Sequence, residues 1–141
     1  HDYVELNYVL NGSSHQFVEG KKVKFNKGDL LFMGPGANHE IHPTEKEDII
    51  LNFIIHKKFF NYIFEFIDEE SSLSNFFIDV IFKSTSTKAL IFNTGSHSGM
   101  EELLNKIINE LRMENNFKES KIKFLLGLLI IELIQYRPKE I

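Results

Sequence analysis

The most constraining feature of this sequence is a change in hydrophobic period, which divides the 141 residues into two unlike halves. Up to about residue 56, apolar residues alternate with polar ones or form short runs between turn residues, which is typical of strands. Further along, apolar residues recur every three or four positions, which is typical of helices that bury one face. Strands followed by helices predict a β-sandwich or β-barrel with a helical region after it.

Six short strands are expected in the first half. Their separators are rich in Gly, Pro, Asn and Asp, which favour turns. Asn11-Gly12 ends the first strand and is the strongest short signal for a β-hairpin, because both residues tolerate positive φ. The predicted strands are Tyr3–Leu10, Ser14–Val18, Lys22–Phe25, Leu30–Met33, His39–His42 and Asp48–Ile55.

Four helices are expected in the second half. Each shows apolar residues on one face and polar residues on the other, except for the last helix. The predicted helices are Phe60–Ile67, Leu73–Ile81, Met100–Leu111 and Ser120–Tyr136. Between the second and third of these, the short apolar piece Ala89–Phe92 is predicted to be extended.

The fourth predicted helix is apolar nearly all round. One face carries Ile122, Leu125, Leu126, Leu129 and Leu133. Much of the remaining circumference is also apolar, so the helix must be covered on two sides. A second copy of the chain is one possible cover, and we predict a homodimer contact through these five residues. The alternative is that the helix lies between the barrel and the third helix.

Composition excludes several classes of function. The net charge is −4, with 16 Lys and Arg against 20 Asp and Glu, which argues against this segment gripping a nucleic-acid backbone. The absence of Cys excludes disulfides and thiolate chemistry. No apolar run reaches the roughly 18 residues of a membrane span. We therefore expect a cytoplasmic protein with no membrane partner.

Two segments resemble the conserved motifs of cupins. The segment Gly28–His39, with the sequence GDLLFMGPGANH, is similar to the second cupin motif, in which a Gly-Asp turn opens a strand and a Pro-Gly turn closes it. The segment His1–Gly12 resembles the strand of the first motif. With the apolar strand near residue 52 and the helices beyond, the whole chain is similar to the N-terminal effector domain of AraC-type transcription regulators.

This resemblance implies a fold and a role. It implies a mainly β fold with added α-helices: a cupin barrel (double-stranded β-helix, or jelly roll) over residues 1–56 that binds a small molecule, often a sugar. It implies a helical subdomain over 57–141 that forms a homodimer, and a DNA-binding helix-turn-helix domain that this chain lacks. The abrupt ends at His1 and after Tyr136 fit a chain trimmed from a longer protein. On this interpretation the chain is not an enzyme and needs no cofactor.

Candidate ligand-binding residues come from strand parity. His1, Tyr3, Glu5 and Asn7 share one face of the first strand, which is too polar for a closed core but suits a wet cavity. Three more residues complete the predicted site: Phe32, His39 and Asn52. Each has a structural alternative, namely core packing for Phe32, a bond within its own turn for His39, and a bond to a neighbouring loop for Asn52.

Metal binding is the alternative interpretation of the same residues. Enzymatic cupins hold a divalent metal through several His and one Glu, and His1, Glu5 and His39 could supply such ligands. The set is incomplete, because Tyr3 and Pro43 stand where the cupin motifs have polar ligands or partners. The alternative function is therefore a metal-dependent cupin enzyme, such as an isomerase or dioxygenase.

Overall fold

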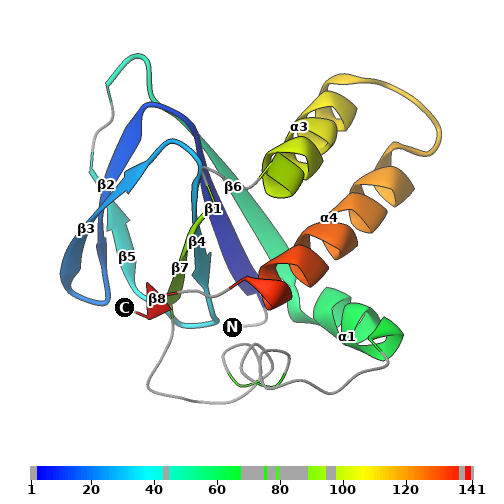
Figure 1. The fold of residues 1–141 in the computed structure, drawn as a ribbon, viewed down its shortest axis with the longest axis horizontal. Helices are drawn as coiled ribbons and strands as arrows, with labels where there is room; N and C mark the ends of the chain where they lie inside the picture. Colours follow the sequence, from blue (N-terminus) through cyan, green and yellow to red (C-terminus); the bar gives the residue numbers. More distant parts are fainter. Residues whose placement is uncertain are drawn as a thin grey trace.

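The computed structural model describes residues 3–42, 45–67, 89–94, 98–136 and 139–140, and the single positions 75 and 79. Two antiparallel sheets face each other, and three helices cover the outer side of the larger sheet (Figure 1). The strands are β1 (Tyr3–Asn11), β2 (Ser13–Val18), β3 (Lys21–Asn26), β4 (Asp29–Met33), β5 (His39–Ile41), β6 (Ile49–His56), β7 (Ala89–Asn93) and β8 (Lys139–Glu140). The helices are α1 (Lys57–Phe66), α3 (Ser98–Arg112) and α4 (Lys118–Gln135). The predicted cupin-like fold class is confirmed.

The larger sheet has the strand order β6-β1-β4-β7-β8, and the smaller sheet has the order β3-β2-β5. β7 is the piece that the sequence predicts as extended, and it pairs with β4 from Asp29↔Asn93 to Met33↔Ala89. The barrel therefore takes strands from beyond residue 56. The sequence-based boundary at that residue is wrong, because a five-residue strand inside a helical region has too short a pattern to show that it returns to the first sheet.

Asn11-Gly12 does not connect a hairpin. β1 pairs with β4 and β6, whereas β2 pairs with β3 and β5, so this turn carries the chain from one sheet to the other. Asp48 holds the corner, because its Oδ1 accepts a hydrogen bond from the backbone N–H of Ser13 at 2.9 Å. The positive φ of Gly12 is as predicted, but the strand that follows it lies in the opposite sheet.

The two-residue hairpin in this region lies at Glu19-Gly20, between β2 and β3. Both residues have positive φ, as a tight hairpin turn requires. Glu19 also binds Asn38 twice: its backbone N–H donates to the Asn38 carbonyl at 2.8 Å, and its Oε1 accepts from the Asn38 N–H at 2.7 Å. The turn thereby fixes the loop that leads into β5.

Strand parity divides the buried residues into two cores. Even-numbered residues of β1, such as Leu6, pack with the three helices in the larger core. Odd-numbered ones, such as Val9, face the other sheet and pack with Val18 and Phe25 inside the barrel. The odd face of β1 is thus the barrel interior, as the sequence predicts.

The helices follow the predicted pattern where the structure describes them. α1, α3 and α4 begin and end within a few residues of the predicted positions. His56 caps the start of α1, since its Nδ1 accepts a hydrogen bond from the Lys58 N–H at 3.1 Å. The predicted helix Leu73–Ile81 lies outside the described residues apart from two single positions.

Candidate functional site: the mouth of the barrel

A pocket of about 550 Å³ opens at one end of the barrel, between the two sheets. β1 contributes Tyr3 and Glu5, β6 contributes Ile54, and β5 contributes His39. The rest of the wall is the end of β4 and the loop after it: Met33, Gly34, Gly36, Ala37 and Asn38. Apolar residues thus line the pocket together with the polar side chains of Tyr3, Glu5, Asn38 and His39, and such polar groups can fix the orientation of a small molecule.

Glu5 and His39 face each other across this pocket. Oε2 of Glu5 lies 3.2 Å from Nε2 of His39, and both side chains are partly exposed. Glu5 belongs to the larger sheet and His39 to the smaller one, so the contact joins the two sheets at the mouth. The atoms are close enough for an ion pair but are not aligned as a hydrogen bond, since Oε2 has no hydrogen-bond partner.

Two atoms of this pair have no hydrogen-bond partner. Glu5 Oε2 and His39 Nδ1 are both shielded from solvent, and neither makes a hydrogen bond. A buried polar atom without a partner is unfavourable by about 1–3 kcal/mol. A ligand group or a water molecule at this point would relieve that penalty.

A second polar cluster lies in the barrel interior. Gln16 Nε2 donates to Asn7 Oδ1 at 3.0 Å and to Ser14 Oγ at 3.2 Å, and all three residues are buried. Asn7 Nδ2 and Gln16 Oε1 have no partner. If both side-chain amides were flipped, the bond would run in the opposite direction. In either orientation, one NH₂ group and one carbonyl oxygen of the pair stay without a partner in the other amide.

The structure brings together three of the predicted ligand-binding residues. Tyr3, Glu5 and His39 line the pocket, and Asn7 lies on the same face of β1 within the barrel. Asn52 pairs with Asn7 across β1 and β6. It is exposed rather than buried, because β6 is an edge strand of its sheet.

Two predicted residues do not join this group. Phe32 packs edge-on against Phe60 of α1 at 6.1 Å between ring centroids, within the core between sheet and helices. It is even-numbered on β4 and so points away from the barrel interior, where Leu31 and Met33 lie. His1 lies outside the described residues.

Several residues of the site carried weaker signals in the sequence. Ile54 lies two residues after Asn52 on the same strand, so it faces the same side of the sheet and could have been predicted together with Asn52. Ser14 and Gln16 gave no signal, because placing them requires knowing that β2 lies in the opposite sheet. The loop residues around Gly36 belong to the recognised turn, but the sequence does not show that this turn forms a pocket wall.

A metal site receives limited support from these side chains. Among the residues that the structure describes, no group of three His, Asp or Glu side chains could hold an ion. Glu5 and His39 supply two ligands, whereas protein zinc sites use at least three. The third residue of the predicted set, His1, is not described.

A separate apolar groove of about 650 Å³ lies between α1 and α4. From α1 it is lined by Phe59, Tyr62, Ile63 and Phe66, and from α4 by Lys123, Phe124, Gly127, Leu128 and Ile131. The helices approach closely at Gly127, where a Cβ would lie 2.8 Å from the end of the Ile63 side chain. Phe124 and Leu128 are 75% and 51% exposed.

This groove lies on a different face of α4 from the one predicted to form the dimer. Leu129 and Leu133 are fully buried in the chain's own core, and Leu125 and Leu126 pack against that core. Ile122 is half-buried. The face of α4 that carries Leu129 and Leu133 is therefore covered by the chain itself, as the alternative interpretation of the sequence expects. Phe124 and Leu128, on the groove side of α4, are exposed.

Comparison with known proteins gives a consistent assignment. Residues 1–53 match the family model of the AraC-like ligand binding domain. The structure is similar to that of apo ToxT from Vibrio cholerae, with a TM-score of 0.69 and 10% identity, over 95% of this chain and 48% of that one. The chain thus spans about half the length of ToxT. No curated protein sequence matches it.

The two sheets form a cupin-like barrel with a pocket at its mouth. The match of residues 1–53 to the AraC-like ligand binding domain confirms the resemblance found in the sequence. Among the described residues, no helix is long and apolar enough to cross a membrane.

Proposed function

We propose that this chain is the effector-sensing and dimerising part of an AraC-type transcription regulator. A small molecule, for which a sugar is the first candidate, binds at the barrel mouth, and a helix-turn-helix domain outside this chain binds DNA. The observation that carries the proposal is the pocket itself, where Glu5 and His39 each have a shielded polar atom without a hydrogen bond, and where Met33 and Ile54 supply apolar surface. Hydroxyl groups need such partners when they are buried.

The reading frame that follows Ile141 tests the regulatory part of this proposal. A segment with helix-turn-helix character there, basic on its recognition helix, is the expected result. A stop codon, or a domain with no relation to nucleic acid, would contradict it.

Dimerisation is proposed through the groove between α1 and α4. Its rim exposes Phe66 and Phe124, both about three-quarters accessible. The same apolar rims on a second copy could pack against them about a twofold axis. The face that we propose is the exposed one, with Phe124 and Leu128 in place of the buried Leu129 and Leu133.

A physical connection runs from the pocket to the end of α4. Met33 lines the pocket and pairs with Ala89 at the start of β7. At the other end of β7, the Asn93 carbonyl accepts a hydrogen bond from the Tyr136 hydroxyl. A ligand that displaces β4 would therefore act on α4 through β7, provided that it binds the two arrangements with different affinity.

A metal-dependent cupin enzyme is the second candidate, favoured by the short Glu5–His39 contact. Metal analysis of protein purified without chelators separates the two. Stoichiometric Fe, Mn, Ni or Zn that is lost on changing Glu5 and His39 would favour the enzyme, and its absence would favour the sensor.

A further inference from the structure

The charge of the mouth pocket restricts its ligand. Among the described residues that line it, Glu5 is the only Asp, Glu, Lys or Arg, and the titratable side chains beside it are Tyr3 and His39. No described Lys or Arg lines the wall to neutralise the carboxylate. An anionic ligand would therefore meet a like charge in a partly desolvated site.

The carboxylate has an aromatic neighbour on the same strand. Tyr3 and Glu5 lie two residues apart on β1 and so face the same way, about 7 Å apart along the strand. The Tyr3 ring packs edge-on against His56, with 5.2 Å between ring centroids, so it is held in place although it is exposed. An aromatic ring beside a carboxylate is a favourable environment for an ammonium group.

The unpaired atoms agree with a donor-rich ligand. Glu5 Oε2 can only accept hydrogen bonds when ionised, and it receives none, although His39 Nε2 lies 3.2 Å away. An ammonium group brings three donors and one positive charge, so it satisfies the oxygen and the charge together. A hydroxyl group satisfies the oxygen alone.

We infer that the mouth pocket selects a small molecule that carries a protonated amine, with Glu5 as the residue that determines this preference. The inference rests on the proposed function, because it names the ligand class of the same pocket. Tyr3 adds contact to the cation, and Met33 and Ile54 hold the apolar part of the ligand. An amine-bearing sugar meets both requirements.

The test uses matched sets of probes that differ in charge. One set is glucosamine, glucose and glucuronate; a second is benzylamine, benzyl alcohol and benzoate. Amide chemical shifts of the ¹⁵N-labelled chain locate each probe and give its Kd. We expect the amines to shift the amides of Glu5, Gly36 and His39 and to bind about tenfold more tightly than the alcohols, with the carboxylates weakest.

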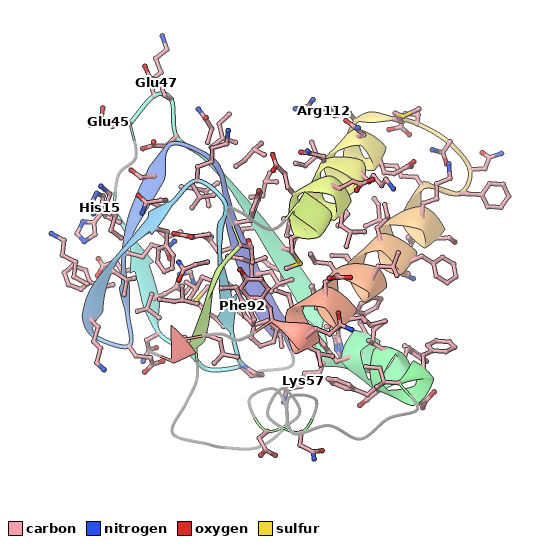
Figure 2. The ribbon with its side chains drawn as sticks, in the orientation of Figure 1. His15, Glu45, Glu47, Lys57, Phe92 and Arg112 are labelled. Carbon is pink, nitrogen blue, oxygen red and sulfur yellow. The ribbon has the colours of Figure 1, made fainter. Side chains whose placement is uncertain are left out.

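Two variants test whether Glu5 is the cause of the preference for amines. Glu5→Gln keeps the size of the side chain and removes its charge, so the amine advantage should disappear while the alcohols still bind. Glu47→Gln is the control, because it removes an exposed carboxylate at a tip of the molecule far from the mouth (Figure 2). It should leave the order of affinities unchanged. An unchanged amide spectrum in Glu5→Gln shows that the fold is intact.

The outcomes separate this inference from the proposed function. If alcohols and amines bind the pocket equally, or if Glu5→Gln keeps the amine advantage, the charge preference is wrong and the small-molecule site stands. If carboxylates bind most tightly, the preference is also wrong. If no probe of any charge shifts the pocket amides, both fail.

Discussion

The hydroxyl of Tyr136 donates a 2.9 Å hydrogen bond to the backbone carbonyl of Asn93, and it joins the end of α4 to the end of β7. The Tyr136 ring also packs near Phe92, with 6.4 Å between centroids. Phe92 lies between the sheet and α4 at the centre of the molecule (Figure 2). Beyond Tyr136, β8 pairs with β7 at Leu90 and Ile91. The exit of α4 is thus attached to the barrel.

Tyr136→Phe should loosen this attachment with a small loss of stability. The variant removes one partly exposed hydrogen bond, for which about 0.5–1 kcal/mol is expected, and it keeps the ring. Hydrogen exchange should quicken at the β8 amides and at the last turn of α4. Tyr62→Phe, on the exposed surface of α1, is the matched control. Equal exchange in both variants would show that the bond does not hold the helix end.

Gln16 and Asn7 should be strongly coupled. Either single change, Gln16→Ala or Asn7→Ala, removes the bond between the two side chains. Gln16→Ala leaves the buried Asn7 amide unpaired and should lower the free energy of unfolding by about 2–3 kcal/mol, whereas in Asn7→Ala the Gln16 amide keeps its bond to Ser14 Oγ and the expected loss is about 1–2 kcal/mol. In the double variant, the decrease in the free energy of unfolding should be smaller than the sum of the two single decreases by at least about 1 kcal/mol. Urea unfolding of all four proteins measures this, and additive losses would contradict the pairing.

Gly12→Ala should be among the most destabilising single changes in the barrel. The residue has a φ of +74°, and an added Cβ would lie 1.9 Å from Asp48 Oδ1, the atom that accepts the Ser13 hydrogen bond. Backbone strain and the broken hydrogen bond together should lower the free energy of unfolding by about 3 kcal/mol or more. Gly20→Ala is the control, because it has a similar φ with no atom near its Cβ. The difference between the two variants reports the Asp48 contact.

Tyr8 should make the fold sensitive to high pH. Burial raises the pKa of its hydroxyl above the ordinary value of 10.0, and the nearby negative charge of Glu101 adds to this. A raised folded pKa means that the folded state favours the protonated hydroxyl. This contribution to stability is therefore complete below about pH 10 and is lost as pH rises through the higher folded pKa.

Urea unfolding between about pH 9 and pH 11 checks this sign. The free energy of unfolding of the wild type should fall more steeply with pH than that of Tyr8→Phe. Parallel curves for the two proteins would contradict the raised pKa. Absorbance of tyrosinate during the titration should show one group that ionises above the ordinary pKa of 10.0, and this step should be missing in Tyr8→Phe.

Phe124→Glu tests dimerisation through the groove. If the groove holds a second copy, a charge there should weaken self-association roughly tenfold or more, about 1.4 kcal/mol. Phe117→Glu is the control, because Phe117 is 69% exposed just before α4 and lies outside the groove. Sedimentation at high micromolar concentration measures both. A monomeric wild type, or equal effects of the two changes, would contradict the proposed interface.

Local patterns in the sequence predicted the elements well, and long-range pairing decided the rest. The alternation of β1 assigned Glu5 and Asn7 to the barrel interior. At Asn11-Gly12 only Gly12 has the positive φ of the predicted turn, and local conformation does not determine which strands pair. Gln16 and Ala89 reach the interior only because distant strands meet, which no short pattern encodes.

The helical wheel of α4 predicted correctly that two sides are apolar, and it could not say which side the chain itself covers. Leu129 and Leu133 pack on the sheet because β1 and β4 present Leu6 and Leu30 to the same core. Phe124, on another face, stays exposed. The assignment of the dimer face therefore depends on tertiary packing rather than on hydrophobicity.

A thermal-shift screen of small metabolites, repeated on Glu5→Ala and His39→Ala, tests whether the barrel mouth is a sensing site. A ligand at about 100 times its Kd should stabilise the wild type by about 2.7 kcal/mol, which raises Tm by roughly 8 °C. Sugars or amines should do so, and either variant should reduce the shift. Undiminished shifts in both variants, or no shift with any metabolite, would contradict a sensing site at the barrel mouth.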